Sequence, residues 1–257
     1  MSAFWRFLKL SVQEDYRMPI AEVFAFLMAL APLTLYASGV NYAVLKGSAA
    51  FSFLSSALGL AGFLFLILIL KNVSFGIGAD LEKGITNTFL TFPMSRAKYL
   101  AAKLVSGALI PFVMFMVAPL PVALAFAPHF SDWGVLLLYW GVEASGMMVI
   151  IGLMVLVALA TKKGSTSLIA GLALYFGSEF ANAFAIFYAE RGNADLFYAL
   201  SVLNPLELWT AHYSRMFRSF SISVSATTAA ALTATSAALG VALLIIAFMT
   251  FDRVIDL

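Results

Sequence analysis

Long apolar segments alternate with short polar ones along the chain. Six of the apolar segments are long enough to cross a bilayer, because one helical crossing takes about 20 residues at about 1.5 Å rise each. They cover residues 20–42, 51–70, 104–126, 135–160, 165–188 and 225–250. The pattern therefore predicts an all-α integral membrane protein with six transmembrane helices in a single domain, residues 1–257.

The composition supports this class and argues against several others. Hydrophobic residues make up 63% of the chain and charged residues 11%, whereas soluble domains carry about 25% charged residues. A net charge of +2 gives no reason to expect a nucleic-acid partner. The absence of cysteine excludes disulfides, thiolate metal sites and cysteine nucleophiles.

The first 18 residues predict an amphipathic helix that lies in the membrane interface. Its apolar face carries Phe4, Phe7, Leu8 and Val12, and its polar positions are Lys9, Gln13 and Glu14. A frayed terminus is the alternative. Charged residues follow the short apolar part too closely for a cleavable signal, so we expect this segment to remain in the mature protein.

Two spans have special compositions. The third contains Pro111, Pro119 and Pro121, which remove backbone hydrogen bonds, so we expect this helix to be bent and packed against neighbours. The sixth repeats small residues at intervals of four, including Ser236 and Gly240. Small residues at this spacing predict close helix packing in lipid.

The distribution of positive charge predicts which side each loop faces. When the N-terminus is assigned to the cytoplasm, 11 of the 15 lysines and arginines fall inside. The four outside are Lys46, Arg191, Arg215 and Arg218. Because cytoplasmic loops are enriched in lysine and arginine, both termini are predicted to be cytoplasmic in a multi-pass protein of the plasma membrane, surrounded by lipid.

The connection at residues 189–223 is too long for a simple turn. Aromatic and leucine residues fill it, and Asn204-Pro205 is a turn signal. We expect short outer helices here, re-entrant or interfacial, between the fifth and sixth spans. An aromatic belt lying flat on the membrane is the alternative interpretation.

The longest polar interruption is residues 71–103, between the second and third spans. Leu81, Ile85, Phe89 and Phe92 recur at helical spacing, which predicts a short amphipathic helix at residues 85–92. Gly84 predicts a bend before this helix and Pro93 ends it. Ser95 is placed to cap the helix that follows, whose lysines, Lys103 among them, are expected to extend to the inner headgroups.

The same segment resembles a known family. Glu82-Lys83-Gly84-Ile85-Thr86, then Phe89-Leu90, then Pro93-Met94-Ser95-Arg96 is similar to the cytoplasmic pattern E-x-G-T-x-x-x-L-x-x-x-P-x-S-R of type-2 ABC exporter permeases. The threonine stands one position later here because Ile85 intervenes. The layout also resembles that family, with an interfacial helix, six spans, a coupling helix between spans two and three, and an outer hairpin.

The resemblance implies a working assembly. Permeases of this family pair as homodimers or heterodimers, and each half docks a separate cytoplasmic ATP-binding subunit through the coupling segment. It implies that Asp80, Glu82, Gly84, Thr86, Phe89 and Pro93 contact the motor or transmit its force. The sequence has no G-x-x-x-x-G-K-[ST] loop, so the chain is not predicted to be an enzyme or to hold a cofactor. ATP and Mg²⁺ would belong to the partner subunit.

Glu143 and Glu179 lie inside predicted spans, where a charge costs roughly 2.5 to 3.5 kcal/mol. They are predicted either to line a translocation path or to brace spans four and five, for example through Asn182, Ser145 or hydroxyls of the sixth span. Bracing is the favoured interpretation. The two histidines lie far apart without ligand-spaced partners, so no metal site is predicted.

Two other functions stay open from the sequence. A proton-coupled secondary transporter would use Glu143 or Glu179 as its proton site. A membrane scaffold would transport nothing. An intramembrane hydrolase is disfavoured because the sequence offers no nucleophile and base that can be paired.

Overall fold

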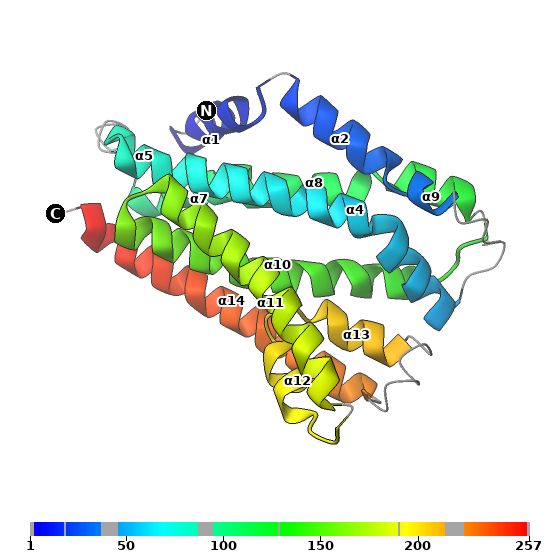
Figure 1. Ribbon diagram of the computed structural model, residues 1–257. Helices are drawn as coiled ribbons and strands as arrows, with labels where there is room; N and C mark the ends of the chain where they lie inside the picture. The colour runs from blue at the N-terminus through cyan, green and yellow to red at the C-terminus, as the bar shows by residue number, and fades with distance from the viewer. Residues whose placement is uncertain are drawn as a thin grey trace.

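The computed structural model describes residues 3–17, 19–36, 46–86, 95–127, 129–189, 191–213 and 224–255. Every regular element within these ranges is helical. Figure 1 shows an elongated bundle whose long helices run roughly side by side. We call its two ends the α5 end and the α9 end, after the short helices found there.

Five helical stretches in the described residues are long and apolar enough to cross a membrane. They are Ser48–Glu82, Arg96–Phe126, Trp133–Thr161, Gly164–Ala189 and Ala226–Phe251. The first consists of α4 (Ser48–Val73), the π-helical segment η1 (Ser74–Gly78) and α5 (Ala79–Glu82). The second consists of α7 (Arg96–Leu104), the π-helical segment η2 (Val105–Leu109), α8 (Ile110–Val117) and α9 (Leu120–Phe126). The others are α10 (Trp133–Thr161), α11 (Gly164–Ala189) and α14 (Ala226–Ile255).

The first predicted span differs from the expectation of one continuous helix. It contains α2 (Ile20–Leu30) and α3 (Leu33–Tyr36), separated by a turn at Ala31 and Pro32. Proline lacks the N–H that would continue the helical ladder, which explains the break. Residues 37–42 of this predicted span lie outside the described residues.

The helical stretches that contain the second and third predicted spans are longer than the predicted residues 51–70 and 104–126. The apolar helix that begins at Ser48 continues to Glu82, and the next begins at Arg96. Their polar extensions are stabilised by contacts with α1 (Ala3–Asp15), which packs on α7. Consequently most of the described part of the polar segment 71–103 is regular helix.

The helix α10 forms the centre of the bundle, in contact with α4, α11 and α14. Glycines permit its closest approaches. A Cβ added to Gly152 would lie 2.6 Å from Cβ of Leu243, and one added to Gly240 would lie 2.7 Å from Cβ of Met148. Real Cβ atoms do not approach so closely, so the small residues of α10 and α14 are required for this contact.

The remaining helices cover the two ends of the bundle. At the α5 end lie α1 and the C-terminal end of α14 (Figure 1). The segment after α11 forms two short helices, α12 (Asp195–Leu200) and α13 (Leu206–Tyr213), joined by a turn that contains Asn204 and Pro205. The helix α13 packs against α4, α10 and α14 rather than projecting from the bundle.

Candidate functional site

The residues predicted to form the coupling segment divide into buried and exposed groups. Glu82 and Gly84 are exposed at the α5 end, whereas Asp80 and Thr86 are buried, with only 4% and 2% of their surface accessible. Gly84 has a φ of +66°, a conformation that favours glycine, and it turns the chain after α5 as predicted. Phe89 and Pro93, and most of the predicted helix 85–92, lie outside the described residues.

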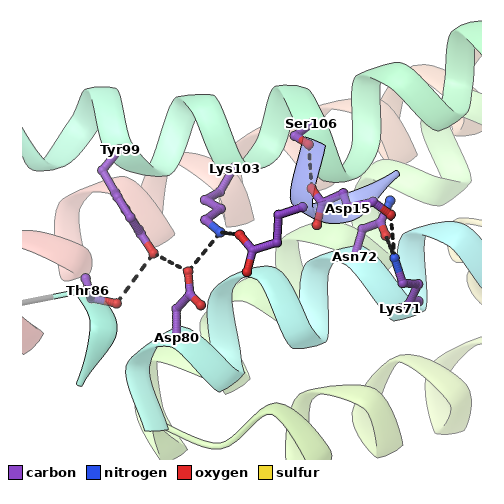
Figure 2. A network of polar contacts seen from close by, with 9 residues as sticks. Asp15, Lys71, Asn72, Asp80, Thr86, Tyr99, Lys103 and Ser106 are labelled. Atoms are coloured by element: carbon purple, nitrogen blue, oxygen red, sulfur yellow. Dashed lines mark hydrogen bonds and ion pairs between the residues drawn. The ribbon is translucent and has the colours of Figure 1, made fainter. Parts of the chain in front are cut away.

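A buried ion pair connects the end of the second apolar helix to the beginning of the third. Lys103 Nζ lies 2.8 Å from Asp80 Oδ2 and 3.1 Å from Glu14 Oε2, so it joins α5, α7 and α1. The hydroxyl of Tyr99 donates a second hydrogen bond to Asp80 Oδ2, at 2.9 Å (Figure 2). The side chain of Lys103 is 1% exposed and that of Asp80 is 6% exposed, which excludes water from their contact.

Tyr99 extends this connection to two further elements. Its ring stacks on Phe251 of α14, with 5.8 Å between centroids, and lies 5.0 Å from the ring of Phe7 of α1. Its hydroxyl is 3.5 Å from Oγ1 of Thr86. One fully buried tyrosine therefore contacts four parts of the α5 end.

A second set of polar contacts continues from Asp15 at the end of α1. Its carboxylate accepts a hydrogen bond from the hydroxyl of Ser106, and its backbone carbonyl accepts one from Lys71 Nζ at 2.6 Å (Figure 2). Lys71 also donates to Asn72 Oδ1 at 3.0 Å. Asn72 Nδ2 donates to the hydroxyl of Tyr16, which donates to the carbonyl of Ser106 at 2.8 Å.

Burial raises the pKa of Asp15, at the end of α1, and of Tyr16, which follows it. Desolvation raises the pKa of the Asp15 carboxyl above its usual range, against the opposing effects of the Ser106 hydrogen bond and of Lys103 and Lys71. Burial also raises the pKa of Tyr16. Tyr16 therefore stays neutral and acts as a hydrogen-bond donor at physiological pH.

Two π-helical segments lie on either side of the cluster. The segment η1 follows Asn72 and precedes Asp80, and η2 contains Ser106. A Cβ added to Gly76 of η1 would lie 3.6 Å from Asp15 Oδ1, so η1 passes directly beneath the carboxylate. Single-turn π segments interrupt α-helices rarely and are frequent at functional sites. We call these contacts of Glu14, Asp15, Lys71, Asn72, Asp80, Tyr99, Lys103 and Ser106 the α5-end network.

The turn between α10 and α11 closes against the same end. A Cβ on Gly78 would lie 2.6 Å from Cα of Gly164, so the two backbones touch. The amide of Gly164 donates to Glu82 Oε2 at 3.4 Å, which places the Glu82 carboxylate at the N-terminus of α11, where the helix dipole favours negative charge. Lys162 and Lys163 of this turn are exposed beside it.

The two carboxylates within the apolar helices α10 and α11 come together at one cavity. Glu143 and Glu179 line one cavity of about 50 Å³, which Tyr175, Ser178 and Asn204 also line. Glu143 Oε1 accepts a hydrogen bond from Tyr139 at 3.2 Å, and Glu179 Oε1 accepts one from Asn204 Nδ2 at 2.8 Å.

These partners differ from the predicted ones. The hydroxyl of Ser145 donates to the carbonyl of Val142. The amide of Asn182 is buried without a hydrogen-bond partner in the described part of the chain.

The hairpin of α12 and α13 also brings Glu207 near Glu179. Burial, followed by the charge of Glu179, raises the pKa of Glu207 to about 6.

Several network residues were not predicted from the sequence. Lys103 was expected to extend to the headgroups, and this is wrong because α1 covers it and two carboxylates pair with it. Tyr99 and Asn72 gave no signal in the sequence beyond their polarity. The sequence did contain one signal for the buried ion pair. Lys103 directly precedes an apolar segment, and the acidic Asp80 follows the preceding apolar segment, so the two charges could have been expected to pair.

No group of three or more histidines, aspartates or glutamates that could hold a metal ion is found among the described residues. Comparisons of the chain with protein-family models, with curated proteins and with solved structures found no match.

Proposed function

We propose that this chain is the membrane-spanning permease subunit of an ATP-driven exporter of the type-2 ABC class. In this proposal it pairs with a second permease half and docks a separate cytoplasmic ATP-binding subunit through residues 80–92. The observation that carries the proposal is the α5-end network, which links the exposed tip at Glu82 to Gly84 with α1, α7 and α14.

A docking segment that drives transport has to pass displacement from an exposed contact to the helices behind it. The tip is exposed and charged, whereas the residues at its base are buried and hydrogen-bonded. A load on the tip therefore acts on Asp80, and through Lys103 and Tyr99 on three other helices. Asp80 and Thr86 would transmit force, whereas Glu82 and Gly84 are accessible to a motor.

The proposed topology places the α5 end in the cytoplasm of a plasma-membrane protein. The helices α2 and α3 would belong to a sixth crossing beside the five long helices, since they extend from near α1 to near α9 (Figure 1). The helix α1 would then lie in the inner interface, and α12 and α13 in the outer half of the membrane. Lysines and arginines are concentrated on the side that this topology makes cytoplasmic.

The test is to purify the full chain from its native membrane and identify what accompanies it. The proposal expects an ATP-binding subunit whose hydrolysis rate depends on the permease. Reversing an exposed tip charge, Lys83→Glu, should release that subunit, because docking surfaces are sensitive to charge reversal. Lys46→Glu is the matched control, since Lys46 is exposed and precedes α4, whose stretch ends in α5 at Glu82. Retention of the subunit by Lys83→Glu, or its loss in both variants, would contradict the proposal.

A second candidate function is proton-coupled secondary transport, favoured by the cavity that Glu143 and Glu179 share. It expects a proton gradient to drive flux through the purified chain alone in vesicles. It also expects Glu179→Gln to abolish that flux, because glutamine cannot release a proton. Absence of flux under a gradient and with ATP would instead indicate a membrane scaffold.

A further inference from the structure

An apolar groove opens on the surface of the bundle at the level of the π segment η2. It has a volume of about 380 Å³ and is lined by α4, α7, η2, α8, α10 and α14. Its lining includes Phe65, Leu104, Ala108, Phe112, Ala144 and Leu244. Leu109, at its rim, is 52% exposed. The volume lies within the range of about 300 to 1,000 Å³ that is typical of ligand sites.

The groove extends from the half of the bundle at the α5 end to its middle. Leu104 is eight residues from the start of α7 and Leu244 is eleven residues from the end of α14, which corresponds to about 12 and 16 Å along the helices. Phe112 and Ala144 lie deeper, 16 residues after Arg96 and 17 residues before Thr161, or about 24 and 25 Å. The hydrocarbon core of a bilayer is about 30 Å thick, so an acyl chain of the leaflet at the α5 end reaches the groove.

The residues of α7 that precede the groove indicate which apolar group fills it. Lys98 is exposed and lies two turns before Val105 on the same side of α7. Ala97 and Ala101, which share this side, are small and accessible, so they leave the path from Lys98 to the groove open. A lysine near the membrane surface attracts anionic headgroups.

We infer that the groove holds one acyl chain of an anionic phospholipid from the leaflet at the α5 end, with the headgroup phosphate paired to Lys98. A helix of a second copy packed along this side of α7 would have to bring a carboxylate to Lys98, because a covered ammonium group without a partner is costly. The bound acyl chain contacts Val105 and Ala108 of η2, the segment that also carries Ser106 of the α5-end network. Lipid occupancy thus stabilises the π segment from the side opposite Asp15.

The test measures lipid binding to the purified, delipidated full chain by native mass spectrometry. Phosphatidylglycerol and phosphatidylcholine with identical acyl chains are the probes. Ala108→Phe fills the groove and should weaken phosphatidylglycerol binding about tenfold or more. Val113→Phe is the matched control, because Val113 is exposed on α8 outside the groove lining, and it should bind as the unmodified chain does.

The headgroup contact is tested separately with Lys98→Gln. Loss of one lysine near the surface should reduce the preference for phosphatidylglycerol over phosphatidylcholine about fivefold. Lys163→Gln, an exposed lysine at the same end but in the α10–α11 turn, should leave the preference unchanged. Equal binding of the two lipids by the unmodified chain would overturn the assignment of an anionic headgroup.

Two further results would overturn the inference as a whole. One is unchanged phosphatidylglycerol binding by both Ala108→Phe and a second groove-filling variant, Ala144→Phe, when each melts as the unmodified chain does. The other is efficient disulfide cross-linking between copies of Ala101→Cys in the native membrane. The chain has no cysteine of its own, so such a product would place a second copy on this face.

Discussion

Replacing Asp80 with asparagine tests whether the α5-end network holds the bundle together. Asparagine keeps the shape of the side chain and can still accept a hydrogen bond from Tyr99, but it removes the negative charge 2.8 Å from Lys103 Nζ. Breaking a buried ion pair on one side costs about 3 to 5 kcal/mol, because the remaining charge stays buried without compensation. Glu14 still pairs with Lys103, so we expect a value near the lower limit, about 3 kcal/mol.

A cost of about 3 kcal/mol corresponds to a fall in melting temperature of roughly 6 to 12 °C for a chain of this size. Thermal unfolding of the purified chain in one detergent, followed by tryptophan fluorescence, measures this shift. Glu14→Gln is the matched control, since the side chain of Glu14 is 56% exposed and an exposed pair contributes about 1 kcal/mol or less. The double variant Asp80→Asn with Lys103→Met should recover most of the loss, because it removes both charges.

The reasoning is refuted if Asp80→Asn destabilises the chain no more than Glu14→Gln does. It is also refuted if the double variant is as unstable as Asp80→Asn alone, because the cost would then not come from an unpaired Lys103. Either result would remove the physical basis for force transmission through Asp80.

Two other predictions concern stability. A pKa of about 6 for Glu207, against 4.5 in the unfolded chain, means that the folded state binds the proton more tightly. Stability should therefore fall by about 2 kcal/mol as pH rises from 4.5 to beyond 6, and Glu207→Gln should lack this component in melts at pH 4.5 and 7.5. Gly78→Ala should cost about 1 to 3 kcal/mol because its Cβ would strike Gly164, whereas Gly59→Ala, with open space around it, should be neutral or stabilising in the same melting assay.

The local features of this fold were predictable from the sequence, and the non-local ones were not. The turn at Gly84 and the cap at Ser95, whose hydroxyl accepts a hydrogen bond from the amide of Lys98, depend on a few neighbouring residues. The contact between Tyr139 and Glu143 could also have been predicted, because residues four apart share a helix face.

Contacts between distant segments needed the fold. Asn204 is 25 residues from Glu179, and nothing in the local pattern pairs them. Lys103 and Glu14 are 89 residues apart, so the burial of this lysine depends on where α1 packs. The break at Pro32 was missed because hydropathy records apolar length and not helical continuity.

The π segment η1 also determines how the chain responds to a change in length. A π turn holds one residue more than the α-helix on either side, so the residues after it keep the direction that a regular helix shorter by one residue would give them. Asn72 hydrogen-bonds to Tyr16 and Asp80 to Tyr99, although eight positions separate Asn72 from Asp80 and a regular helix would turn them about 80° apart. Deleting one residue between them, such as the exposed Phe75, would leave seven steps of regular helix, which turn Asp80 only about 20° from Asn72 and keep it directed toward Lys103. This stretch is therefore expected to accept the loss of one residue, whereas an insertion of one residue would turn Asp80 away from Lys103.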